Sequence, residues 1–275
     1  MAGVIRRVLT RKRSALTDSL IVVRTTGRAL IQQRFLVRVM VGVLVLLVSS
    51  LVIWRLAAPP PGSKARSAAR PVMVSLRVVL TLCVQHIVAS WLFARWSGER
   101  GERVLRLWRR LVKRLPAFAA CAALLGWLDH ASGSGGAATI VRSGAAFAMS
   151  YLLSYAVPAA AAFHCGMWAA TVRSVRAFRR TFGADMFAWS GMWVVNGVVA
   201  LLTAVPEALD LYSPATGGLA GRLSGWLLVL PLTMTATAIG AGFCTVIYYA
   251  LETGRAPEGY PVTPVETISG LQLAR

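Results

Sequence analysis

The chain lacks the motifs that bring nucleotides, metals or catalysis to a protein. Its 275 residues contain no GxxxxGK[ST] phosphate-binding loop, so an ATP-driven role would need a partner subunit. Neither His86 nor His164 stands in an HExxH zinc-protease pattern. Asp129, His130 and either Ser132 or Ser134 are close in sequence, but geometry defines a catalytic triad and Ser/Gly-rich stretches are usually turns. We therefore expect a non-enzyme with no catalytic residues, cofactor or bound metal.

Acidic side chains are scarce. Ten Asp and Glu residues stand against 30 Lys and Arg residues, which gives a formal net charge of +20. No carboxylate lies deep in an apolar segment, because Asp129 and Asp185 stand at segment ends. A proton-coupled carrier usually needs an acid or a histidine relay at membrane depth, so only histidines qualify for that role.

Cysteines are also few, and none forms a CxxC pair. A disulfide framework normally joins loop cysteines of a small secreted domain. Here all four lie inside apolar segments, where free cysteine behaves as a small buried hydrophobe. We predict packing thiols at Cys83, Cys121, Cys165 and Cys244.

Six apolar stretches dominate what the sequence does contain. A helix needs about 20 mainly apolar residues to cross a hydrocarbon core of about 30 Å. A chain that is 56% hydrophobic, with mean hydropathy +0.62, fits that requirement better than a water-soluble core. We predict an all-α polytopic membrane bundle: a basic amphipathic arm (1–35), a six-helix membrane domain (36–251) and a cytoplasmic C-terminal tail (252–275). The predicted spans are 36–57, 72–94, 115–128, 143–172, 186–205 and 226–251.

The basic residues cluster beside these stretches. This placement is typical of residues that orient a membrane protein and attract anionic lipid, so we expect lipid partners and no nucleic acid. If the spans alternate, most basic residues share one side, including those in 95–114 and 173–180. The positive-inside rule then places both termini in the cytoplasm. The connector 57–71, with its Pro-Pro-Pro run, is predicted to be a stiff loop that cannot be helical.

Residues 103–115 have the pattern of an amphipathic helix at the membrane surface. The apolar residues recur at helical spacing: Val104, Trp108, Leu111, Val112 and Leu115. The opposite side is predicted to contact anionic lipid through Arg103, Arg106, Arg110 and Lys113. The alternative is that this stretch extends the helix of 115–128, which is short enough to be a half-span.

The fourth span, 143–172, is long and has Pro158 near its middle. Proline removes a backbone donor, so we predict a kink there, which is common in packed membrane helices and also occurs at transport sites.

Polar groups at membrane depth are candidates for function because burying them is expensive. The candidate site comprises Gln85, His86, His164 and Asn196. If the histidines share a water-accessible cavity, protonation near neutral pH would switch it. If each hydrogen-bonds separately inside the bundle, its role is structural, and we favour that interpretation.

The end of the sixth span, VIYYALETGRAPEGY at 246–260, carries a specific pattern. Its members are Tyr248, Tyr249, Ala250, Thr253, Gly254, Pro257, Glu258, Gly259 and Tyr260. With the overall layout, this pattern resembles a group of uncharacterised bacterial integral membrane proteins. The resemblance implies a six-helix domain in a bacterial inner membrane and supplies no activity.

The sequence therefore predicts a membrane scaffold that interacts with lipid or with a protein partner, either a second copy or another membrane protein. The alternative is a membrane-spanning permease subunit of a transporter, driven by a separate ATPase.

Overall fold

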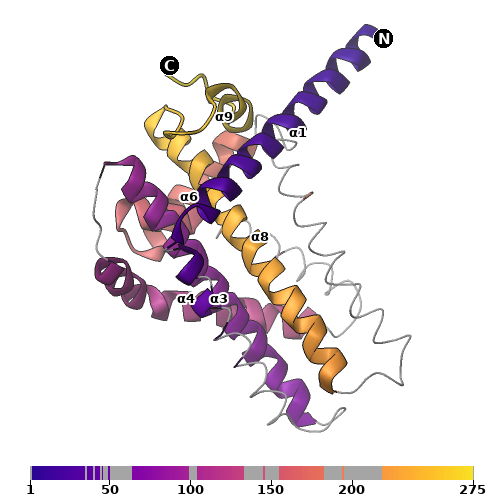
Figure 1. Ribbon diagram of the computed structural model, residues 1–275, viewed down its shortest axis with the longest axis vertical. Coiled ribbons are helices and arrows are strands. Elements are labelled where there is room, and N and C mark those ends of the chain that lie inside the picture. Colours follow the sequence, from indigo (N-terminus) through magenta and orange to yellow (C-terminus); the bar gives the residue numbers. More distant parts are fainter. Residues whose placement is uncertain are drawn as a thin grey trace. The chain divides into compact units, whose positions relative to one another are not determined.

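The structure is a computed structural model that describes residues 2–34, 36–39, 41–43, 45, 49, 64–98, 104–132, 145, 155–182, 194 and 219–274. Over these residues the chain is all-α, as predicted, and its only β-type pairing is an isolated bridge between Arg255 and Ala274. The named helices (Figure 1) are α1 (Ala2–Ile31), α3 (Lys64–Trp96), α4 (Val104–Ser132), α6 (Met167–Phe182), α8 (Leu219–Thr253) and α9 (Val262–Ser269).

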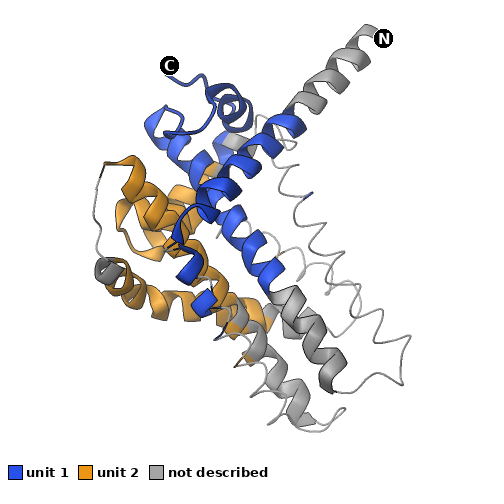
Figure 2. Cartoon of the chain, in the orientation of Figure 1, with its two compact units in different colours: residues 1–48, 179–275 blue, residues 49–178 orange. Residues whose placement is uncertain are grey.

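The chain divides into two compact units (Figure 2). The first unit comprises residues 1–48 and 179–275, and the second comprises residues 49–178. Helices α1, α8 and α9 pack together in the first unit, and α3 packs with α4 in the second.

Two of the described helices are long and apolar enough to cross a membrane. They are Val78–Trp96 within α3 and Pro231–Thr253 within α8, judged by length and composition. These helices correspond to the predicted spans 72–94 and 226–251. Most of the predicted spans 186–205 and 36–57 lies outside the described residues, so the count of six remains a prediction.

Helices α3 and α4 form an antiparallel pair in the second unit. One stripe of α4 is buried, through Leu107, Leu111, Phe118, Ala122 and Leu125. In the N-terminal part of α3, the Ser75 hydroxyl donates to the carbonyl of Ala122 in the C-terminal half of α4, at 3.1 Å. Residues 104–115 of the amphipathic stretch and the short apolar stretch 115–128 thus belong to a single helix, with Pro116 inside it. This is the arrangement that the alternative interpretation predicted.

The start of α3 corrects the prediction for the connector 57–71. That segment was expected to be a loop that cannot be helical, but α3 begins at Lys64 and continues through residues 65–71. Alanine, lysine and arginine dominate 64–70, and these are strong helix formers. The proline run therefore says little about the residues that follow it.

The predicted span 143–172 is not one helix. Residues 155–163 are helical and include Pro158, whereas 164–166 are not helical and α6 follows from Met167. His164 has φ 50°, in the left-handed region that often ends helices. The break thus lies after Phe163, and it separates an apolar helix from a basic one.

In the first unit, α1 crosses α8 near the end that carries α9 (Figure 1). Gly27 lies at this crossing: a Cβ atom on it would stand 3.7 Å from Ile239 Cδ1. The buried face of α1 includes Ala15, Val22 and Leu30, as expected for an amphipathic arm.

The segment after α8, predicted only as a tail, is folded. We call residues 254–274 the C-terminal cap. Within it, the Leu273 amide donates to the Glu266 carboxylate at 3.0 Å, and the Ala274 amide donates to the Gly254 carbonyl at 2.9 Å. The Tyr260 hydroxyl donates to Thr26 Oγ1 at 3.2 Å, which joins the cap to α1.

Candidate functional site

The N-terminal half of α4 exposes a mixed apolar and basic face. We call Trp108, Arg109, Val112, Lys113 and Leu115 the α4 surface; all five are exposed, Trp108 by 47% and Val112 by 57%. At 100° per residue, its apolar members lie next to the buried stripe and its basic members lie farther round the helix. This order resembles a helix that lies at head-group depth.

The predicted members of this face have different fates. Lys113 is exposed, Arg110 is half-buried, and Leu111 is buried at 3% exposure rather than facing lipid. Arg103 and the side chain of Arg106 lie outside the described residues. The prediction omitted the exposed Arg109.

Arg114 points inward and binds the end of a neighbouring helix. Its Nη1 donates to the Cys165 carbonyl at 2.7 Å and its Nη2 to the Ala160 carbonyl at 2.8 Å. Carbonyls at a helix C-terminus lack intrahelical donors and carry partial negative charge, so a guanidinium satisfies them well. Burial lowers the pKa of the Arg114 guanidinium, Cys165 acts in the opposite direction, and Arg110 adds to the lowering. Arg114 therefore has a structural role in fixing the break after Phe163.

His86 is buried, at 2% exposure, on the inner side of α3. Its ring meets Phe118 of α4 edge to face, with centroids 5.8 Å apart, and its Nε2 lies 3.5 Å from Ser90 Oγ. Within the described part of the chain, His86 Nδ1 has no hydrogen-bond partner. These contacts are typical of a core histidine with one unsatisfied nitrogen.

The other predicted polar residues do not gather round His86. Gln85 is half-buried and, one position along α3, points about 100° away from His86. His164 is exposed at the helix break. Asn196 lies outside the described residues.

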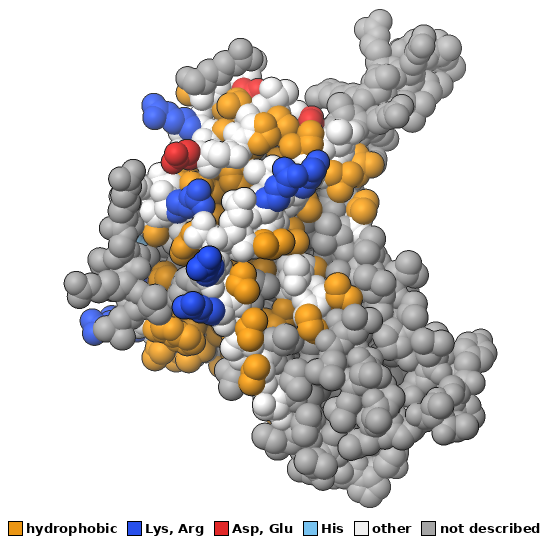
Figure 3. All heavy atoms as spheres, viewed as in Figure 1, with side chains coloured by type: hydrophobic (Ala, Val, Ile, Leu, Met, Phe, Trp, Pro, Cys, Tyr) orange, Lys and Arg blue, Asp and Glu red, His pale blue; other side chains and the backbone are white. Residues whose placement is uncertain are grey.

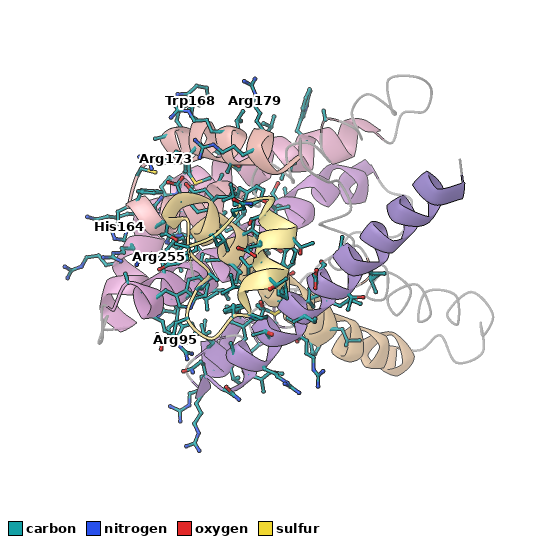
Figure 4. All side chains as sticks on the ribbon, turned by 90° about the horizontal axis from the view of Figure 1, so that it is seen from above. Arg95, His164, Trp168, Arg173, Arg179 and Arg255 are labelled. Carbon is teal, nitrogen blue, oxygen red and sulfur yellow. The ribbon has the colours of Figure 1, made fainter. Side chains whose placement is uncertain are left out.

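Helix α6 carries a second basic face that the sequence reasoning missed. Its buried side consists of Ala170, Ser174 and Ala177. We call the exposed residues on the opposite side the α6 surface: Trp168, Val172, Arg176, Arg179 and Arg180. Trp168 is 82% exposed and projects on the same side of α6 as Arg179 (Figure 4). The recurrence of arginine at 173, 176, 179 and 180, after Gly166, is the signal that could have identified this helix.

Basic side chains are the prevailing charge on the described surface. On the face in Figure 3, they lie among hydrophobic side chains, and the few acidic groups gather near the top. The cysteines are free, and Cys83 and Cys244 are buried, in agreement with the predicted packing role. Among the described residues, no three His, Cys, Asp or Glu side chains gather as metal ligands would.

Comparison with protein-family models, with curated proteins and with solved structures found no match. The resemblance to bacterial membrane proteins therefore stays a prediction from the sequence pattern.

Proposed function

We propose that this chain is a multi-pass protein of a bacterial inner membrane, without catalytic activity, that serves as a scaffold. Its basic cytoplasmic face holds anionic lipid and, through it, protein partners. The two helices able to cross a membrane support the membrane assignment. The observation that carries the lipid assignment is the α4 surface, where Trp108 and Val112 stand exposed beside Arg109 and Lys113.

The chemistry of the α4 surface matches the head-group layer. Indole rings prefer the membrane–water interface, and arginine and lysine bind lipid phosphates while their stems lie along apolar surface. A leaflet rich in anionic lipid attracts each basic residue with about 1 kcal/mol near the surface. The face is thus suited to recognise an anionic leaflet rather than a neutral one.

A permease subunit is the second candidate, and the helix break at 164–166 is the observation in its favour. Discontinuous helices often form the substrate sites of transporters. The helix after the break, however, is α6, which carries four arginines instead of a second apolar half-span. We therefore rank the scaffold first. Substrate flux in proteoliposomes, or co-purification with an ATPase, would reverse that order.

The lipid-binding role is tested by removing positive charges from the α4 surface. Arg109→Gln with Lys113→Gln removes two exposed charges, and Arg24→Gln with Arg28→Gln removes two exposed charges from α1 as a matched control. The measurement is the phosphatidylglycerol retained per protein after purification in mild detergent. We expect the α4 pair to lower retention severalfold and the α1 pair to leave it nearly unchanged. Equal retention in both pairs would contradict the proposal.

Orientation is tested separately by labelling introduced cysteines from either side of the membrane. Residues 104–114 and the C-terminal cap should both react from the cytoplasmic side. Labelling of residues 104–114 from the outside would show that the topology is the reverse of the one proposed.

A further inference from the structure

The exposed side of α6 combines two chemistries in one place. Trp168 and Val172 alternate round the helix with Arg176, Arg179 and Arg180, and the sequence of α6 contains no acidic residue. Its opposite side is already packed through small residues such as Ala170 and Ala177. The exposed side therefore faces away from the protein core.

The start of α6 is firmly placed. Arg114 binds the carbonyls of Ala160 and Cys165 just before it, and the Arg173 guanidinium lies 3.8 Å above the Phe163 ring. A stacked arginine and a bidentate arginine hold the turn in one geometry better than flexible lysines would. Trp168, immediately after this turn, is thus presented outward from a fixed position.

We propose that the α6 surface is a second lipid-binding face, which lies in the head-group layer of the anionic leaflet with Trp168 as its interfacial anchor. This inference rests on the proposed function, since it requires a membrane-embedded chain. The face would bind anionic phospholipid through Arg176, Arg179 and Arg180. It extends lipid recognition from α4 to a separate helix.

Charge complementarity and the exposed tryptophan identify the occupant. An anionic leaflet supplies phosphates at many lateral positions, which suits three arginines spread over one side of a helix. The same layer accommodates an indole ring that is 82% exposed in the protein. An acidic protein would pair with the arginines but would need its own pocket for Trp168.

The test uses the full chain in lipid nanodiscs. An environment-sensitive fluorophore is attached to Trp168→Cys in a chain whose native cysteines are replaced by alanine. Discs contain either phosphatidylcholine alone or one part phosphatidylglycerol to two parts phosphatidylcholine, with brominated lipid as quencher. Iodide reports access from water. A fluorophore on Val112→Cys reports the α4 surface in parallel.

We expect lipid quenching at position 168 to be at least about twofold stronger in the anionic discs, and to weaken as salt rises. Replacing Arg176, Arg179 and Arg180 with Gln should reduce it to the phosphatidylcholine level. The matched control replaces three exposed arginines of the N-terminal arm with Gln and should leave it unchanged: Arg24 and Arg28 of α1, and Arg34 just after it.

Three results would overturn the inference. Equal quenching in both discs would show apolar insertion without anionic recognition, and free access to iodide in both would show a solvated face. Shielding from both lipid and iodide would show a protein-covered face. If the probe at 112 is quenched by anionic lipid while that at 168 is not, the proposed function stands and only the α6 inference fails. If neither probe is quenched, both fail.

Discussion

Replacing Arg114 should destabilise the second unit more than replacing any exposed basic residue of α4. Its two hydrogen bonds, at 2.7 and 2.8 Å, satisfy the carbonyls of Cys165 and Ala160 at a helix end. A hydrogen bond with one charged partner contributes about 1.5–3 kcal/mol, and partial burial places these two near the lower end. We therefore expect Arg114→Met to lower the free energy of unfolding by about 2–4 kcal/mol.

The conservative variant sharpens this prediction. Arg114→Lys keeps the charge, but a single ammonium cannot reproduce the planar two-point contact, so we expect roughly half the loss. Lys113→Met is the control, because that neighbour is exposed and should change stability by no more than about 0.5 kcal/mol.

The assay is equilibrium unfolding in detergent micelles, followed by circular dichroism, with hydrogen exchange over residues 160–168. In Arg114→Met the amides of this segment should exchange faster, because the helix end frays without its cap. If Arg114→Met and Lys113→Met proved equally stable, the guanidinium contacts would not hold the break, and the fixed placement of Trp168 would lose its support.

Three further changes are tested by the same unfolding measurement. Gly27→Ala should stabilise the first unit by about 0.5–1 kcal/mol, because glycine is costly inside a helix and the new Cβ would lie at an ordinary contact distance of 3.7 Å from Ile239 Cδ1. A loss of stability would mean that the crossing of α1 and α8 tolerates no side chain at this position. Tyr260→Phe should lower the free energy of unfolding by about 1 kcal/mol, because it removes the hydrogen bond to buried Thr26. A double-mutant cycle with Thr26→Val should show coupling between the two positions, and additive losses would argue against the hydrogen bond. His164→Gly should raise the free energy of unfolding by about 1 kcal/mol, because a φ of 50° is unfavourable for any residue other than glycine. An unchanged stability would show that local contacts offset this strain.

The long apolar helices were readable from sequence because they depend on a property summed over many residues. A run such as 78–96 stays apolar whatever its neighbours do, so its length alone predicts a helix able to cross a membrane. The amphipathic arm was equally readable, since α1 keeps a buried stripe at helical spacing over many turns.

The break after Phe163 was hidden for the opposite reason. Phe163, Trp168 and Val172 are apolar, so the apolar pattern continues from one side of the helix end to the other and does not mark it. Pro158 lies inside the helical stretch 155–163, so the helix end after Phe163 is a separate feature from the kink predicted at Pro158. A helix end is set by a few local contacts, here Arg114 from another helix, and no window average can register a contact between residues about 50 positions apart in sequence.

The polar site shows the same limit. Depth along a predicted span identified His86 as buried, but which neighbours it meets depends on the rotation of α3 against α4. Adjacent positions on a helix differ by about 100°, and with this rotation His86 is buried against α4 whereas Gln85 is only half-buried. Predicting whether these polar residues share one site therefore requires knowledge of how the helices pack, which hydropathy does not supply.

The C-terminal pattern at 246–260 has a structural explanation that bears on what a resemblance can mean. Gly254 and Gly259 have φ of 66° and 85°, a region that other residues rarely adopt, and Gly254 also accepts the Ala274 amide. Tyr260 reaches Thr26 across the unit, and Tyr248 donates to the Glu252 carboxylate. Gly254 and Tyr260 thus help to fold the C-terminal cap and to join it to α1, whereas the Tyr248 hydrogen bond lies within α8. Structural contacts therefore account for this part of the pattern, and a search for function is better directed at the exposed arginines and tryptophans of α4 and α6.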